Sequence, residues 1–170
     1  MEFNILLASI LIICIITDIQ NRKIYNMVVF PALIIALIMH LILGGWQALG
    51  YSLLGFMTGF LILLVPYLMG GMGAGDVKLL ALIGCIKGAF FVLNTAIYMA
   101  IIGAFIALII IMFRKGILQR LKAIGYYISG MKLGIRIPIW ITRKAQQSTY
   151  PYGVAIVLGA VMSLIGNGWF

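Results

Sequence analysis

Acidic side chains are almost absent from this chain. Only Glu2, Asp18 and Asp76 are acidic among its 170 residues, whereas an average protein of this length carries roughly 20 acids. An acid that is retained in so acid-poor a sequence invites a functional explanation.

Cysteine and histidine are also scarce, which removes several kinds of chemistry. Cys14 and Cys85 each fall inside an apolar run and have no Cys-x-x-Cys partner, so they predict neither a disulfide framework nor a zinc site. We interpret both as small buried hydrophobic side chains. The one histidine, His40, belongs to no plausible nucleophile–base pair. We therefore expect a protein that uses no metal and no cofactor.

Long apolar runs take up most of the chain. With 65% hydrophobic residues, 9% charged residues and a mean hydropathy of +1.22, the composition predicts an integral membrane protein with one domain, residues 1–170. Runs without alternation of polar and apolar residues favour helices over a barrel. We expect an all-α bundle of about six membrane-spanning helices. The expected spans are residues 3–17, 27–43, 48–69, 77–93, 94–113 and 152–169.

The basic residues predict how these spans are oriented. Twelve basic and three acidic residues give a net charge of +9, which fits the cytoplasmic loops of a membrane protein, and we expect no nucleic-acid partner. With both termini outside, every basic residue except Lys87 faces the cytoplasm. No basic segment and no cleavage sequence precede Asp18, so we expect the first run to be a retained span and not a signal peptide.

One long polar stretch, residues 114–150, separates the last two expected spans. It holds eight basic residues and no acid. Up to residue 137 its apolar residues recur every three or four positions, which predicts an amphipathic helix at the cytoplasmic membrane surface. Anionic lipid of the inner leaflet is its expected partner. The helix would brace the membrane surface or guide a substrate, and the pattern leaves both roles open.

A glycine-rich stretch, residues 70–78, lies between two apolar runs and carries an acid. Four glycines within six residues precede Asp76, and glycine lets another backbone approach closely. Asp76 opens the fourth expected span and Asp18 follows the first, so both are expected at the cytoplasmic boundary. Two facing carboxylates cannot both ionise easily. The ionised one can then take a proton from water while the protonated one polarises a carbonyl, which is the chemistry of aspartic proteases.

Simpler interpretations of the single residues also stay open. Asp76 after a glycine turn would commonly be a helix N-cap, and Asp18 beside Arg22 would commonly be a solvated loop residue. Because a helix N-terminus favours an anion, we hypothesise that Asp76 is the more acidic member of the pair. Lys78 is expected to pair with Asp76 or to reach lipid phosphate, and Lys87 to extend outward or to face an internal cavity.

Three short motifs follow one another in the chain. The stretch 18–26 has Asp, Ile and Asn at the spacing D-x-x-x-x-x-I-P-N, with Tyr25 in place of the proline. Residues 73–79 read Gly-Ala-Gly-Asp-Val-Lys-Leu, as in G-x-G-D-x-K-L, and residues 151–153 read Pro-Tyr-Gly, with Val154 where a second proline is common. In these motifs the chain resembles the type IV prepilin peptidase family of intramembrane aspartic proteases, in a short form that lacks the cysteine-tetrad domain.

The resemblance implies an endopeptidase that removes the basic leader of type IV prepilins or pilin-like proteins. It places the active site at the cytoplasmic face of a prokaryotic plasma membrane, with Asp18 and Asp76 as the catalytic pair. Without the cysteine-tetrad domain, zinc and methyltransferase activity are not expected. The residues expected to support the active-site loop are Gly73, Gly75, Lys78 and Asn26.

Two other kinds of function remain as alternatives. A non-enzymatic membrane protein, such as a small ion-coupled carrier or a pilus assembly factor, would use the aspartates as proton or cation sites, but the sequence has no inverted repeat and no acid at mid-membrane. A presenilin-like protease shares the glycine–aspartate arrangement, but Thr17 precedes Asp18 where that group has tyrosine. No feature of the sequence assigns an oligomeric state.

Overall fold

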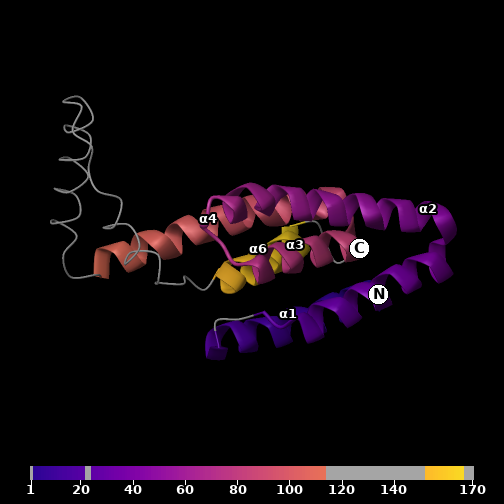
Figure 1. The fold of residues 1–170 in the computed structure, drawn as a ribbon, viewed down its shortest axis with the longest axis horizontal. Helices are drawn as coiled ribbons and strands as arrows, with labels where there is room; N and C mark the ends of the chain where they lie inside the picture. Colours follow the sequence, from indigo (N-terminus) through magenta and orange to yellow (C-terminus); the bar gives the residue numbers. More distant parts are fainter. Residues whose placement is uncertain (1, 22–23, 114–151, 167–170) are drawn as a thin grey trace, which may run out of the picture. The chain divides into compact units, whose positions relative to one another are not determined.

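The computed structural model describes residues 2–21, 24–113 and 152–166, and all regular structure in these ranges is helical. Three of the helices are long and apolar enough to cross a membrane, namely α1, α2 and most of α4. The all-α membrane fold is therefore confirmed, whereas the number of six spans stays a prediction. The helices are α1 (Glu2–Asn21), α2 (Asn26–Leu68), α3 (Ala74–Lys87), α4 (Ala89–Phe113) and α6 (Tyr152–Gly166) (Figure 1).

The chain divides into two compact units. Residues 1–103 together with 151–170 form the first, and residues 104–150 form the second. The amphipathic helix expected within residues 114–150 lies outside the described residues. The contacts analysed below all belong to the first unit, which contains both aspartates.

The helix α1 continues one turn beyond its expected end. The expected span stops at residue 17, with Asp18 in the following loop, but α1 runs to Asn21. No proline or glycine interrupts this turn, and the Thr17 hydroxyl donates hydrogen bonds back to helix carbonyls of Ile13 and Cys14 at 3.1 Å. Asp18 is therefore a helical residue. It extends the buried face that Leu7, Leu11 and Cys14 form at steps of three and four residues.

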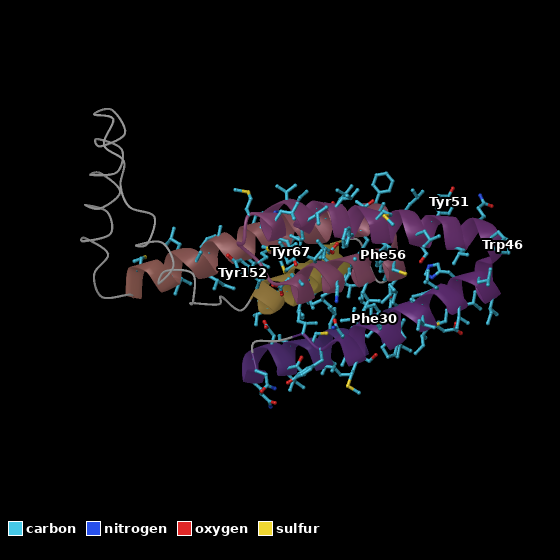
Figure 2. The ribbon with its side chains drawn as sticks, in the orientation of Figure 1. Phe30, Trp46, Tyr51, Phe56, Tyr67 and Tyr152 are labelled. Atoms are coloured by element: carbon cyan, nitrogen blue, oxygen red, sulfur yellow. The ribbon has the colours of Figure 1, made fainter. Side chains whose placement is uncertain are left out.

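The helix α2 consists of two helical stretches joined at Gly45. This glycine has φ 64° and ψ −160°, a conformation that is strained for any residue with a Cβ atom. The turn predicted at Gly44-Gly45 thus coincides with the break, where Figure 1 shows the helix change direction. Trp46 follows directly and is 82% exposed (Figure 2). Towards its end α2 remains helical past Pro66 and stops at Leu68.

The second half of α2 packs against α3 with the two backbones in direct contact. A Cβ atom at Gly55 would overlap the carbonyl oxygen of Gly84, and one at Gly84 would overlap the carbonyl of Gly55. One turn further along α2, a Cβ at Gly59 would lie 2.5 Å from a backbone oxygen of α3. At the other end of this contact, the Ser52 hydroxyl donates a hydrogen bond to the carbonyl of Cys85 at 2.7 Å. Small residues spaced in this way let apolar helices approach closely.

The turn between α3 and α4 lies at Gly88. This glycine has φ 87°, and its amide donates to the Gly84 carbonyl at 2.7 Å, as in many helix C-caps. The expected division between residues 93 and 94 is therefore wrong, because Asn94 continues within α4. Lys87 becomes the last residue of α3. It is half-buried, and its ammonium lies 5.7 Å from the centre of the Phe91 ring.

The helix α6 is held in the core by small residues. A Cβ at Gly159 would lie 2.8 Å from backbone atoms of Thr95 and Met99 on α4. Ala155, Ile156 and Ala160 are also buried on α6, each at most 2% exposed. Within the first unit α6 contacts α1 and α3 as well. Its first turn is thereby placed next to the end of α1.

The α2–α3 contact leads to a test with a matched control on the same helix. Replacing Gly55 with Ala adds a methyl group against the α3 backbone, and overpacking of this kind costs about 1–3 kcal/mol. We expect Gly55→Ala to lower the thermal unfolding midpoint in detergent. Gly50→Ala should keep or raise it, because a Cβ at Gly50 meets no atom within 4 Å and alanine favours a helix. Equal midpoints for the two variants would contradict the contact.

Candidate active site

Asp18 is a buried carboxylate at the end of α1. It is only 4% exposed, so the interpretation as a solvated loop residue is wrong. Its Oδ2 atom accepts a hydrogen bond from the backbone N–H of Val154 at 3.1 Å. Val154 belongs to the first turn of α6, where N–H groups have no partner within the helix. The end of one helix and the start of another therefore meet at this carboxylate.

Gly153 makes this meeting possible. A Cβ atom at this position would lie 2.5 Å from Oδ2 of Asp18 and 2.7 Å from its Cγ, closer than real Cβ contacts. Any side chain at position 153 would therefore push the carboxylate away from α6. The sequence motif at residues 151–153 marked the start of this helix, but it did not indicate that the helix start contacts Asp18.

Asp76 occupies the first turn of α3 and is half-buried. The N-cap of α3 is Gly73, with φ −81° and ψ 151°, so the interpretation of Asp76 as the N-cap is wrong. Instead its Oδ2 reaches back and accepts the Gly73 N–H at 3.1 Å, as the third helical residue does in a capping box. The glycine loop and the carboxylate thus hold each other in place.

The two carboxylates influence each other electrostatically. Burial raises the pKa of Asp76 from its ordinary 3.8 to about 6; the Gly73 N–H opposes this shift, and the negative charge of Asp18 adds to it. Its position at a helix N-terminus therefore does not give Asp76 an unusually low pKa, and the hypothesis that it is the more acidic member of the pair stays a prediction. The helices α1 and α3, which carry these two residues, are in contact.

The residues expected to support the glycine loop make contacts of their own. The Lys78 ammonium donates to Oδ1 of Asn26 at 2.9 Å and lies 5.1 Å from the centre of the Phe30 ring. These partners on α2 differ from both expected ones, Asp76 and lipid phosphate. A Cβ at Gly75 would lie 3.0 Å from Cβ of Ile24. The motif around residues 18–26 and the glycine loop are therefore packed together.

A pocket of about 220 Å3 opens beside the start of α3. Most of its wall is apolar. Sequence analysis did not point to its α2 residues, because their pattern is that of any apolar helix. Within residues 2–21, 24–113 and 152–166 there is no cluster of three or more His, Cys, Asp or Glu side chains that could hold a metal. The pocket is lined by Phe60, Leu64, Tyr67, Ala74, Val77 and Lys78.

Comparison with known families identifies the chain. A sequence model described as the Type IV leader peptidase family matches residues 5–115, which is well over half of the chain and includes both aspartates. The protein belongs to this family. Searches of curated proteins and of solved structures found no match. The membership confirms the resemblance seen in the sequence motifs, and it makes the protein a membrane-embedded peptidase of the type IV leader peptidase kind.

The leader peptidase site thus has three parts, and the sequence pointed to two of them. The first is Asp18 with residues 24–26 and the second is Asp76 with its glycines; Ile24 packs beside Gly75, Asn26 accepts from Lys78, and the charge of Asp18 acts on Asp76. The third part is the first turn of α6, which contributes a backbone amide and the space beside Gly153. A backbone donor leaves no signal in side-chain chemistry, so the sequence alone could not reveal it.

The contact between Lys78 and Asn26 can be tested by a double-mutant cycle. We expect Lys78→Met and Asn26→Ala each to lower the thermal stability of the leader peptidase, and the double variant to lose less than the sum. The coupling should be about 0.5–1 kcal/mol, because the contact joins a charged donor to an amide oxygen. Strictly additive losses in detergent would show that the two side chains do not interact. Thr58→Ala offers a control, since its hydroxyl bonds only within α2 at Leu54.

Proposed function

We propose that this leader peptidase is an intramembrane aspartic endopeptidase. Asp18 and Asp76 form the catalytic pair, and the substrate is a type IV prepilin or a pilin-like protein whose basic leader is removed at the cytoplasmic face of a prokaryotic plasma membrane. The observation that carries the proposal is that two carboxylates on different helices act on each other: burial raises the pKa of Asp76, and the negative charge of Asp18 adds to that rise. Family membership supports the substrate class.

The environments of the two carboxylates favour different roles. Asp18 accepts the Val154 N–H, and a hydrogen bond to a carboxylate favours its ionised form. Asp76, whose pKa is raised to about 6, retains a proton more readily than an ordinary aspartate. In this arrangement Asp18 is the general base and Asp76 the general acid, although the pair titrates jointly.

The reaction proceeds in two proton-transfer steps. Asp18 takes a proton from a water molecule as the water oxygen bonds to the scissile carbonyl carbon, while the proton of Asp76 passes to the carbonyl oxygen. A neutral tetrahedral diol results, with Asp18 protonated and Asp76 ionised. The carbon–nitrogen bond then breaks as the Asp18 proton passes to the leaving amine, and a diol hydroxyl returns a proton to Asp76. One water is consumed, and both carboxyls regain their starting states.

The expected topology agrees with this position of the site. With both termini outside, α1 ends and α3 begins on the cytoplasmic side, where Arg22, Lys23 and Lys78 follow the two aspartates in sequence. A substrate whose leader stays in the cytoplasm would then present its cleavage site at the depth of the pair. Asp18 lies in the last turn of α1 and Asp76 in the first turn of α3, so both are near helix ends.

The proposal predicts that each of the two carboxylates is required for prepilin cleavage. Asparagine keeps the size of aspartate but cannot exchange the proton, so Asp18→Asn and Asp76→Asn should each reduce cleavage of a co-expressed prepilin at least about 100-fold. Membrane levels of both variants should match the wild type. The matched control is Glu2→Gln, which changes the remaining acid, an exposed residue in the first turn of α1, and should cleave normally. Near-normal cleavage by Asp18→Asn or Asp76→Asn in stable protein would overturn the proposal.

A further inference from the structure

We infer that the first turn of α6 is a positioning element for Asp18: the Val154 N–H and the open space at Gly153 hold its carboxylate in the orientation in which it accepts a proton. This inference rests on the proposed function, because it concerns how the proposed base is kept in place. It adds a third chain segment to the site, from outside the region that defines the family match.

The first observation is the contact itself. The Val154 N–H donates to Oδ2 at 3.1 Å, and Asp18 is 4% exposed. A buried carboxylate depends on such donors, because it has lost most of its water. The amide belongs to the backbone of a helix, so it cannot rotate away as a side-chain donor could. The bond therefore fixes the direction of the carboxylate as well as favouring its charge.

The second observation is steric and independent of the hydrogen bond. Gly153 lies so close that a methyl group there would be 2.5 Å from Oδ2 of Asp18. Gly153 adopts no positive φ in the structure, so its backbone conformation does not require glycine. What requires glycine at this position is the closeness of the carboxylate.

The third observation is that α6 is anchored without Asp18. Gly159 brings its backbone against α4 near Thr95 and Met99, and Ile156 and Ala160 are fully buried. The first turn is thus presented to Asp18 by a helix whose position is set elsewhere. A fixed donor is what a positioning element needs, since a flexible one would follow the carboxylate and not direct it.

Several titratable groups gather where these helix ends meet, so the effect of α6 has to be separated from theirs. Asp76 on α3 and Cys14 on α1 each interact electrostatically with Asp18. Tyr152 at the start of α6, Tyr25 before α2 and Lys78 near the start of α3 are also titratable, whereas Arg22 and Lys23, which follow Asp18 in sequence, lie outside the described residues. A useful variant must remove the α6 donor and leave all of these side chains unchanged.

Val154→Pro is such a variant. Proline has no N–H, and a helix tolerates it in the first turn, so the change deletes the donor while every titratable side chain stays. Cleavage of purified prepilin should be followed as kcat/KM against pH, in detergent. Without this donor the Asp18 anion is less stable and needs a higher pH to form. The acid limb of the profile should therefore move up by about one pH unit, which lowers kcat/KM about tenfold at the acid end. Val154→Ala keeps the N–H and should keep the wild-type midpoint of the profile.

A second pair of variants decides the question if the proline variant does not fold. Gly153→Ala places a methyl group against the Asp18 carboxylate and should lower kcat and shift the pH profile. Gly159→Ala is the matched control, because it crowds the same helix against α4, away from Asp18. It should lower thermal stability but leave the pH profile of the surviving enzyme unchanged. A merely structural role for Gly153 predicts the same result for both glycines.

The outcomes separate the inference from the proposed function. If Asp18→Asn is inactive and the folded α6 variants keep the wild-type pH profile, the inference fails and the catalytic pair stands. If Asp18→Asn cleaves normally, the proposed function fails, and the positioning role fails with it. A shifted profile in Val154→Pro or Gly153→Ala, together with an unshifted one in Gly159→Ala, supports the inference.

Discussion

The close approach of α2 and α3 determines where the site can form. Gly55 and Gly84 bring the two backbones into direct contact, and the buried bond from Ser52 to the Cys85 carbonyl fixes the register of one helix along the other. Nine of the fourteen residues of α3 are buried. Its first turn, with Asp76 and the glycine loop, therefore projects from a rigid base, which a catalytic carboxylate requires if its distance to a partner is to be maintained.

The constraint on Asp18 is the energetic cost of burying its charge. Asp18 is a charged group on the buried face of an apolar helix, and burying a charge without partners is costly. In this protein the cost is offset by a neighbouring helix start, whose backbone amide reaches the carboxylate because Gly153 has no side chain. The same contact that makes the buried anion tolerable also orients it. Stability and the proposed chemistry thus depend on one arrangement of α1 and α6.

Much of the fold and of the site could be predicted from the sequence. Two rare acids at the ends of apolar runs implied a shared boundary, and the structure brings Asp18 and Asp76 into electrostatic contact. The helix class and the break at Gly45 followed from hydropathy and glycine. The end of α1 was misplaced, because a polar Asp18 resembles the start of a loop when its buried environment is unknown. The turn at Gly88 was missed, because glycines also occur inside apolar helices and Asn94 was the more polar residue.

The sequence pattern could not predict contacts between residues that are far apart in the chain. Nothing in the spacing of Lys78 distinguishes a bond to Asn26 from one to Asp76 or to lipid, since all three satisfy an ammonium. The raised pKa of Asp76 also depends on its burial, which its place at a helix N-terminus does not reveal. Every residue except proline carries a backbone amide, so only the fold could show which amide meets Asp18.

The central claim is that Asp18 and Asp76 act on each other as one pair, and carboxyl NMR tests it most directly. They are the two aspartates of the chain, so aspartate labelled with 13C at the carboxyl carbon gives one signal for each. The account predicts that Asp76 titrates with a pKa near 6, above its ordinary 3.8, and at lower pH in Asp18→Asn, which removes the neighbouring charge. An Asp76 signal that titrates near pH 3.8, with the same pKa in the wild type and in Asp18→Asn, would contradict the account.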